Sequence, residues 1–245
     1  MKSIFDDLPK KPLGRKSYGS IAHLPGSRMG PGDHKCHEGQ AAIALTKPRD
    51  KYDRIFVQEK LDGSNVGAAR IGDLIVPLTR AGYVANTSPY EMHHRWYDFV
   101  FKHADRFRAV LEDGERLCGE WLIQAHGTRY DLPHEPFVAF DIMRGAERLP
   151  WGKLVERTNG QFITPFTAIG PASIEWAMQH FGEYGMHGAM EPIEGFMWRV
   201  ERHEKNKPAR VDFLVKYVRS DKKDGVYLTS ESGGAPVMNT WRDRI

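Results

Sequence analysis

Short apolar runs, some alternating with polar residues and separated by turn residues, predict a chain built mainly from strands. We expect strands at Ile55–Lys60, Val66–Ile71, Leu74–Arg80, Arg116–Ile123, Phe137–Met143, Ile193–Val200 and Val211–Val218. The turn at 62–65 predicts that the first two form a hairpin, and Pro77 places the third at a sheet edge or a bulge. The expected fold class is therefore α+β, with largely antiparallel sheets flanked by helices.

Helical periodicity marks two further segments. Ser88 is expected to cap a long helix, with Pro89 at the first helical position. Glu91 completes a capping box with Ser88. Gly114 is expected to end this helix. Along it, apolar side chains recur at steps of three and four: Trp96, Phe99, Val100, His103, Phe107, Val110 and Leu111. This spacing favours core packing over base stacking by the aromatic rings. A shorter helix is expected at Ser173–Phe181.

The stretch Tyr18–Gly39 is rich in Gly, Pro and His and has neither strand nor helix periodicity, so we expect a long loop. A plain surface loop is the favoured interpretation. Two others stay open. Glycine amides with cations such as Arg28 and His34 can hold a phosphate or a nucleic-acid end. Asp33, with His34, Cys36 and His37, can instead bind a metal, although adjacent ligands without a second cluster are weak evidence.

Composition places the chain among ordinary globular proteins. Its 245 residues are 40% hydrophobic and 27% charged, which fits one large domain or two small ones. Neither a membrane span nor a secretory signal is present by pattern, and two cysteines cannot form a disulfide framework, so a reducing cytoplasm is expected. Basic residues exceed acidic ones at both ends of the chain, which raises the expectation of nucleic-acid binding modestly.

The most informative segment is Glu59-Lys60-Leu61-Asp62-Gly63-Ser64-Asn65. A lysine between an apolar strand and a tight turn is partly desolvated, and desolvation lowers a lysine pKa because it penalises the charged form. A neutral amine is a nucleophile, so Lys60 suits covalent catalysis. Gly63 permits the sharp turn. On this segment alone, an incidental surface lysine beside a β-turn explains the pattern equally well.

The pattern Lys60-x-Asp62-Gly63-x-Asn65 resembles motif I of the covalent nucleotidyltransferases, the superfamily of ATP-dependent ligases and messenger-RNA capping enzymes. Segments resembling the companion motifs follow in order: Thr79–Gly82, Leu117–Trp121 (motif III), Phe137–Ile142 (motif IIIa), Glu194–Arg199 (motif IV) and Phe213–Tyr217 (motif V). The set spans about two-thirds of the chain. Glu59, Asn65 and the Thr-Arg-x-Gly pattern make it most similar to the RNA ligase 2 branch, whose members seal RNA ends.

This resemblance implies an ATP-dependent RNA ligase with the nucleotidyltransferase fold. Lys60 would attack the α-phosphorus of ATP to form lysyl-AMP. AMP would then pass to a polynucleotide 5′-phosphate, and a 3′-hydroxyl would displace it. The catalytic residues implied are Lys60, Lys216 on the α-phosphate, and Glu194 as the carboxylate for Mg²⁺ or Mn²⁺. The nucleotide-binding residues implied are Glu59, Lys60, Asp62, Asn65, Arg80, Glu120, Phe140, Glu194 and Lys216.

Within that set, the resemblance implies that Asn65 and Glu120 orient the ribose and phosphates and that Phe140 stacks on adenine. Glu59 would contact a base edge. Sequence position alone favours a core role for Phe140, because it lies on an apolar strand. Arg199 is equally well explained as an exposed strand residue.

Two features depart from the branch. Val218 stands where the branch carries a second motif V lysine, so Arg219, Lys222 or Lys223 would have to supply that charge. Residues 220–245 are also too few for an OB domain or a C-terminal helical domain. We expect one nucleotidyltransferase domain over 1–245: an extension at 1–54, the motifs at 55–219, and a tail.

These departures keep two alternatives open. The protein could be an adenylyltransferase that does not complete sealing alone, or a non-catalytic nucleic-acid-binding protein on this fold. Retention of Lys60, Glu120, Glu194 and Lys216 argues against the second. RNA or RNA-containing ends are the expected partner, together with a protein that replaces the missing domain.

Overall fold

The computed structural model describes residues 8–242, which form two compact units. Unit 1 comprises residues 8–19, Ser64–Trp121 and Phe137–Thr164, and unit 2 comprises Ser20–Gly63, Leu122–Pro136 and residues 165–242. The expected single domain over 1–245 stays a prediction, and its residues 1–7 and 243–245 lie outside the described part.

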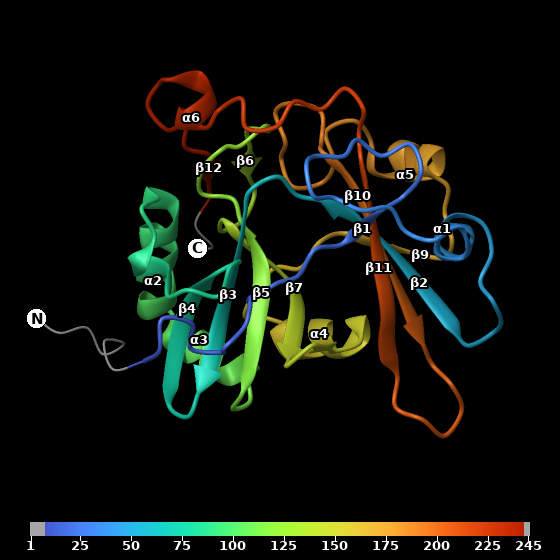
Figure 1. Ribbon diagram of the computed structural model, residues 1–245, viewed down its shortest axis with the longest axis horizontal. Coiled ribbons are helices and arrows are strands. Elements are labelled where there is room, and N and C mark those ends of the chain that lie inside the picture. Colours follow the sequence, from blue (N-terminus) through green and yellow to red (C-terminus); the bar gives the residue numbers. More distant parts are fainter. Residues whose placement is uncertain (1–7, 243–245) are drawn as a thin grey trace, which may run out of the picture. The chain divides into compact units, whose positions relative to one another are not determined.

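Unit 1 is built on a five-stranded antiparallel sheet in the order β4–β3–β5–β7–β8 (Figure 1). Its elements are β3 (Ser64–Ile71), β4 (Leu74–Thr79), a 3₁₀ turn (Ala85–Thr87), α2 (Glu91–Lys102), α3 (Ala104–Val110), β5 (Glu115–Trp121), β7 (Phe137–Arg144), β8 (Glu147–Arg148) and α4 (Trp151–Thr158). Helices α2 and α3 pack on β3 and β4, and α4 packs on β7.

Trp96 is the centre of the unit 1 core. Its side chain is fully buried, and its indole Nε1–H donates to the Gly67 carbonyl at 3.0 Å. The rings of four other aromatic residues surround it: Phe99, Phe107, Trp121 and Phe137. The aromatic stripe therefore serves packing, as its helical spacing predicts.

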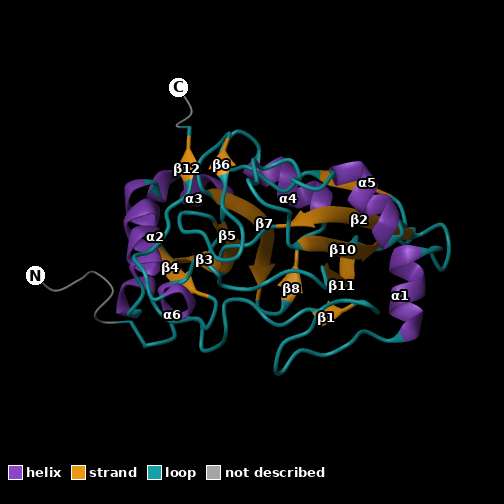
Figure 2. Ribbon diagram, turned by 90° about the horizontal axis from the view of Figure 1, so that it is seen from above, coloured by secondary structure: helices purple, strands orange, loops and turns teal. Residues whose placement is uncertain are grey.

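Unit 2 is built on a second five-stranded sheet, in the order β1–β11–β10–β2–β9, of which only the β1–β11 pair is parallel. Its elements are β1 (Ala22–His23), α1 (Glu38–Leu45), β2 (Asp53–Lys60), β6 (Asp131–Leu132), β9 (Thr167–Ile169), α5 (Ile174–Phe181), β10 (Gly195–Arg202), β11 (Arg210–Val218), α6 (Thr229–Ser232) and β12 (Thr240–Trp241). Strands β6 and β12 pair separately. The core of the sheet includes Ala44 from α1 and Phe181 from α5. Figure 2 shows both helices beside the strands of this sheet.

The structure confirms the α+β class and the position of every predicted strand. Pro77 lies in β4, which is an edge strand as expected. Ser173 caps α5, because its Oγ accepts the Trp176 N–H at 3.1 Å. None of the helices within residues 8–242 has the length and apolar character needed to cross a membrane.

The predicted hairpin of the first two strands is wrong. Strand β2 is paired on both edges, by β10 and β9, and β3 is paired on both edges, by β4 and β5. Neither strand therefore has an edge to offer the other, and the turn at 62–65 instead carries the chain from unit 2 to unit 1.

The single helix from Ser88 to Gly114 is also wrong. Pro89 disfavours a helical conformation at Ser88, and the helix starts after Tyr90, whose N–H donates to Ser88 Oγ at 3.3 Å. His103 adopts non-helical angles and divides the segment into α2 and α3. The expected loop at Tyr18–Gly39 contains β1 and the start of α1.

Replacing Trp96 by Ala should lower the free energy of unfolding by about 3 to 5 kcal/mol, because the cavity cannot be refilled by four already packed rings. Urea denaturation followed by far-ultraviolet circular dichroism measures this. Phe101→Ala on the same helix removes a ring that is 64% exposed, and should change stability by less than about 0.5 kcal/mol. Equal losses for the two variants would contradict this description of the core.

Candidate active site

The ends of three neighbouring strands meet in unit 2. Gly195, the first residue of β10, is the register partner of Lys60 at the end of β2 and of Val218 at the end of β11. Its φ is +156°, and an added Cβ would lie 1.9 Å from the carbonyl oxygen of Tyr217. Only glycine tolerates this approach. Glu194, the residue before Gly195, consequently lies directly beside the end of β2.

Lys60 and Glu194 form an ion pair through Lys60 Nζ and Glu194 Oε2. The Lys60 side chain is 21% exposed, and Glu194 is 8% exposed. Burial raises the pKa of Glu194, and the Lys60 charge opposes that rise. The pair is therefore removed from water together, so the charge on each side chain depends on the other.

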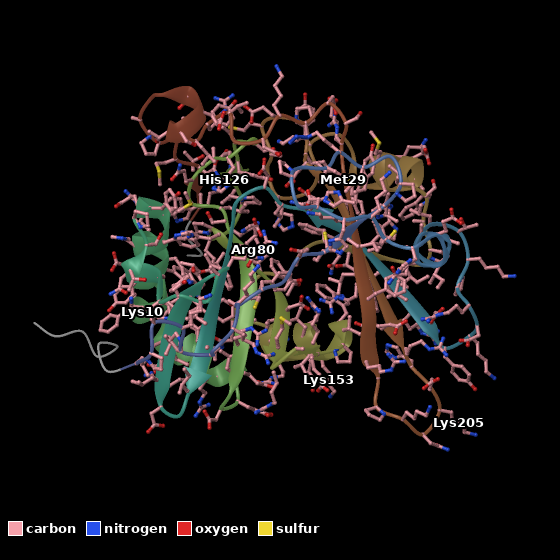
Figure 3. All side chains as sticks on the ribbon, viewed as in Figure 1. Lys10, Met29, Arg80, His126, Lys153 and Lys205 are labelled. Carbon is pink, nitrogen blue, oxygen red and sulfur yellow. The ribbon has the colours of Figure 1, made fainter. Side chains whose placement is uncertain are left out.

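His126 is a neighbour of this pair that the sequence analysis missed. It lies in the loop that follows β5 (Figure 3). Burial lowers its pKa, Asp62 acts in the opposite direction, and Lys60 lowers it further. A histidine followed by a glycine after motif III was the only signal in the sequence, and it is too common to be diagnostic.

The turn after Lys60 is anchored through Asp62. Its Oδ2 accepts the Gly127 N–H at 3.0 Å and lies 3.1 Å from Lys222 Nζ. Lys222 is 7% exposed, and its ammonium also donates to the Gly127 carbonyl at 2.8 Å and contacts Thr128 Oγ1. The Asp62 N–H donates to the Tyr130 hydroxyl at 3.1 Å. Asp62 therefore fixes the nucleophile's turn, and Lys222 is committed to Asp62.

The motif V strand places Lys216 close to a carboxylate from the predicted loop. Lys216 Nζ lies 3.6 Å from Asp33 Oδ1. Val218, two residues on, is buried. Arg219 pairs with Asp221 through two hydrogen bonds of 3.1 and 2.7 Å. Of the cations considered as replacements for a second motif V lysine, Arg219 and Lys222 thus already have acidic partners.

Glu59 is 2% exposed, and its Oε2 accepts the Met186 N–H at 2.8 Å. Within the described residues, its buried Oε1 has no hydrogen-bond partner. Gly185, at φ +59°, packs so closely that an added Cβ would lie 2.4 Å from the carboxylate. Burial raises the pKa of Glu59 to about 7. At the other end of the same strand burial also raises the pKa of Asp53, but hydrogen bonds from arginines hold it at about 2.

Asn65 and Glu120 lie in unit 1, where they are direct register partners on β3 and β5. Glu120 is half-buried. Asn65 Oδ1 is buried and, among residues 8–242, has no hydrogen-bond partner. Such an orphaned acceptor next to a carboxylate is suited to a polar ligand.

Phe140 sits at a bulge in β7. The register of β5 and β7 shifts between the pairs Cys118–Asp141 and Gly119–Ala139, which skips Phe140. The bulge leaves its ring half-buried between buried neighbours, which corrects the expectation of a plain core residue. The ring of Tyr18 meets it edge-on at 5.1 Å, and the Tyr18 hydroxyl donates to Asp141 Oδ2 at 2.6 Å.

The predicted residues not yet described are Arg80 and Arg199. Arg80 is exposed directly after β4, and its guanidinium donates to the Gly19 carbonyl at 3.3 Å (Figure 3). Arg199 is buried and lies 3.9 Å from Glu201, so the interpretation of Arg199 as an exposed strand residue is wrong. The predicted residues in unit 2 are Glu59, Lys60, Asp62, Glu194 and Lys216, and those in unit 1 are Asn65, Arg80, Glu120 and Phe140.

A preformed metal cluster is not part of this arrangement. Across the described part of the chain, no three His, Cys, Asp or Glu side chains group closely enough to hold a metal ion. The metal interpretation of residues 33–37 is therefore not supported by the structure. Glu194 offers one buried carboxylate, a hard-oxygen donor of the kind that Mg²⁺ and Mn²⁺ prefer.

Comparison with known proteins yields one family match. Residues 53–218 match the family model described as RNA ligase. No curated protein sequence matches the chain significantly. An archaeal ATP-dependent RNA ligase structure is 18% identical, with a TM-score of 0.48, over 83% of this chain and 48% of its own.

Two variants of a Naegleria gruberi RNA ligase are also similar to this chain. One, solved with AMP and Mn, is 16% identical with a TM-score of 0.47, over 84% of this chain and 61% of its own. The other, solved with ATP and Mn, is 16% identical with a TM-score of 0.47, over 89% of this chain and 63% of its own. This chain thus spans from about half to less than two-thirds of these solved chains.

The raised pKa of Glu59 predicts a gain in stability on substitution. Above pH 7 the ionised carboxylate is buried, whereas in the unfolded chain it titrates near its ordinary value of 4.5. The folded state binds more protons between these values, so its stability falls as pH rises from 4.5 to 7. The free energy of unfolding of Glu59→Gln should therefore exceed that of the wild type by roughly 3 kcal/mol at pH 8. At pH 4 the two free energies should be equal.

Urea unfolding at the two pH values measures this difference. Glu183→Gln, at an exposed position two residues before Gly185, is the matched control and should show no pH-dependent difference. Equal stability of Glu59→Gln and wild type at pH 8 would mean that the carboxylate is solvated in the folded protein.

Proposed function

The chain belongs to the RNA ligase family, and from this premise we propose that it is an ATP-dependent RNA ligase whose nucleophile is Lys60. The observation that carries the proposal is the ion pair of the partly buried Lys60 with the buried Glu194 at the paired ends of β2 and β10. A lysine held there is desolvated and presented at the start of a rigid turn. Both conditions favour covalent catalysis by an amine.

In the first step, the Lys60 amine attacks the α-phosphorus of ATP. A nitrogen–phosphorus bond forms, the bond from the α-phosphorus to the bridging oxygen breaks, and pyrophosphate leaves. The amine must first lose its ammonium proton, and Glu194 Oε2 is its contacting acceptor. Burial of Glu194 strengthens it as a base, since burial raises its pKa. The product is a lysyl-AMP phosphoramidate.

Positioning and neutralisation of charge are the main requirements of this displacement. We assign Lys216 to the α-phosphate and Arg80 to phosphate charge as a second cation. Once the proton taken from Lys60 has passed to solvent, the ionised Glu194 carboxylate would hold Mg²⁺ or Mn²⁺. When bound, the metal supplies further positive charge against the phosphates. Asp62 acts indirectly, by fixing the turn that carries Lys60.

The nucleoside part of ATP is assigned to Asn65, Glu120, Phe140 and Glu59, of which Asn65 and Glu59 each have a buried oxygen without a hydrogen-bond partner among the described residues. Asn65 Oδ1 and the Glu120 carboxylate on adjacent strands suit ribose or phosphate oxygens. Phe140, set off by its bulge and supported by Tyr18, suits stacking on adenine. Glu59 Oε1 suits the edge of the base, because a polar ligand group would relieve its missing hydrogen bond.

In the later steps, AMP passes to an RNA 5′-phosphate and a 3′-hydroxyl then displaces it. A specific observation favours a second candidate, an adenylyltransferase that stops before sealing. Val218 is buried where the RNA ligase 2 branch has a second lysine, and Lys222 is committed to Asp62. This leaves fewer cations near Lys216 for a strand end than that branch provides.

Incubation with α-labelled ATP and Mg²⁺ or Mn²⁺ should label the wild-type protein through a bond that survives denaturing electrophoresis. Lys60→Ala should remove the label completely, because Lys60 is the proposed nucleophile. Lys153→Ala, on the exposed face of α4, is the control and should label fully. Label retained by Lys60→Ala, or no label on folded, nucleotide-free wild type with either metal, would refute the proposal.

Strand joining separates the two candidates. With a nicked RNA duplex carrying a 5′-phosphate and a 3′-hydroxyl, a complete ligase should accumulate joined strands and release AMP. An adenylyltransferase should accumulate 5′-adenylylated RNA while the nick persists. Denaturing gels of end-labelled RNA resolve the two products.

A further inference from the structure

The Gly-, Pro- and His-rich stretch is bound along the edge of β11. The Leu24 N–H donates to the Lys216 carbonyl at 2.8 Å, and the Arg28 N–H donates to the Val218 carbonyl at 2.9 Å. His23 is the parallel register partner of Lys216. A second layer follows, since the Cys36 N–H donates to the His23 carbonyl at 2.9 Å. Residues 22–36 therefore form part of the sheet edge that carries Lys216.

A series of side-chain contacts starts and ends on β11. The Val218 N–H donates to Ser27 Oγ at 2.9 Å, and this oxygen lies 2.6 Å from His23 Nδ1. His23 Nε2 lies 3.1 Å from Asp33 Oδ2, and Asp33 Oδ1 lies 3.6 Å from Lys216 Nζ. The series thus runs from the backbone of Val218 to the ammonium of Lys216, two residues away on the same strand.

The charges of Asp33 and His23 follow from their surroundings. Burial raises the pKa of Asp33, but the Gly30 N–H at 2.9 Å and the Lys216 charge outweigh it and keep the carboxylate ionised. An ionised carboxylate only accepts, and His23 Nε2 lies 3.1 Å from it in an electrostatic contact without hydrogen-bond geometry. His23 is buried and neutral, since burial and Lys216 lower its pKa. Its Nδ1 is hydrogen-bonded to Ser27 Oγ at 2.6 Å, and the Ser27 hydroxyl also donates to the Arg28 carbonyl at 3.3 Å.

We propose that Asp33, oriented by His23 and Ser27, is a positioning residue for Lys216, which rests on the proposed function of Lys216 at the α-phosphate. An ammonium has three N–H donors on a flexible stem. A carboxylate on one side of it fixes the direction of the other donors. The extension preceding motif I thereby becomes part of the phosphate-binding apparatus, acting through Lys216 without touching the substrate.

Single-turnover formation of lysyl-AMP tests this proposal. Asp33→Asn keeps the size of the side chain but removes its charge, so the rate at saturating ATP should fall about tenfold, while the half-saturating ATP concentration changes much less. Asp33→Glu restores the charge and should recover part of the rate. Asp221→Asn removes a carboxylate that pairs with Arg219 and should behave as the wild type.

A double-variant cycle distinguishes positioning from general support of the fold. In a Lys216→Ala background, Asp33→Asn should slow the reaction by less than about twofold, because its effect passes through Lys216. An undiminished tenfold loss in that background would overturn the proposal. So would tighter ATP binding by Asp33→Asn, because it would make Asp33 a competitor of phosphate.

Acylation of Lys216 by an amine-reactive reagent, read by mass spectrometry, provides a measurement that does not depend on activity. Loss of the Asp33 charge should increase the reactivity of Lys216 several-fold relative to Lys153, because the ion pair favours the unreactive ammonium. If the wild type labels with ATP and Asp33→Asn labels equally fast, only the positioning role fails. If folded wild type never labels, the proposed function and this inference fail together.

Discussion

Charges that the fold takes out of water must be paired, and this requirement shapes unit 2 around the end of β2. Lys60 forms an ion pair with Glu194, and two residues further on Asp62 forms an ion pair with Lys222. Each pair joins segments far apart in the sequence, so the strand ends are held where the charges need them. An unpaired buried charge would cost several kcal/mol, which makes the arrangement all-or-none. Glu59 is the exception, with one buried oxygen left without a partner in the described structure. A buried polar atom without a hydrogen-bond partner is expected where a bound ligand supplies the missing hydrogen bond.

Local irregularities of the backbone bring these groups together. At Gly195 the carbonyl of Tyr217 occupies the space of a side chain, and Gly195 stands in register with Lys60, so that Glu194 immediately precedes β10 beside the end of β2. At Gly185 the carboxylate of Glu59 occupies the corresponding space. In unit 1, the β7 bulge turns Phe140 out of the core. Regular strands provide the rigid frame, and single irregular positions aim the functional side chains.

The sequence allowed the strands and the motif residues to be located, because apolar patterns and fixed spacings are local. It misplaced the partner of β2, since pairing depends on which strand edges are free, and those edges come from residues beyond 160. It missed β1, because two residues have no periodicity to detect. The neighbours His126 and Lys222 follow from loop paths that no local pattern encodes. Asp33 was noticed only as one of several polar residues in a loop, and its contact with Lys216 needed coordinates.

The order in which the chain is made has a consequence for when the nucleophile's surroundings exist. Lys60 and Glu194 are 134 positions apart, and β2 lies between β9 and β10, both of which come from the last third of the chain. During translation, Lys60 emerges from the ribosome long before any strand that pairs with β2. Unit 1, whose last segment ends at Thr164, is synthesised in full before β10 begins. A nascent or truncated chain that ends before β10 therefore cannot carry the assembled Lys60–Glu194 pair, because the pairing of β2 with β10 must await the later segment. The Lys60–Glu194 pair can therefore form only after β10 has been synthesised.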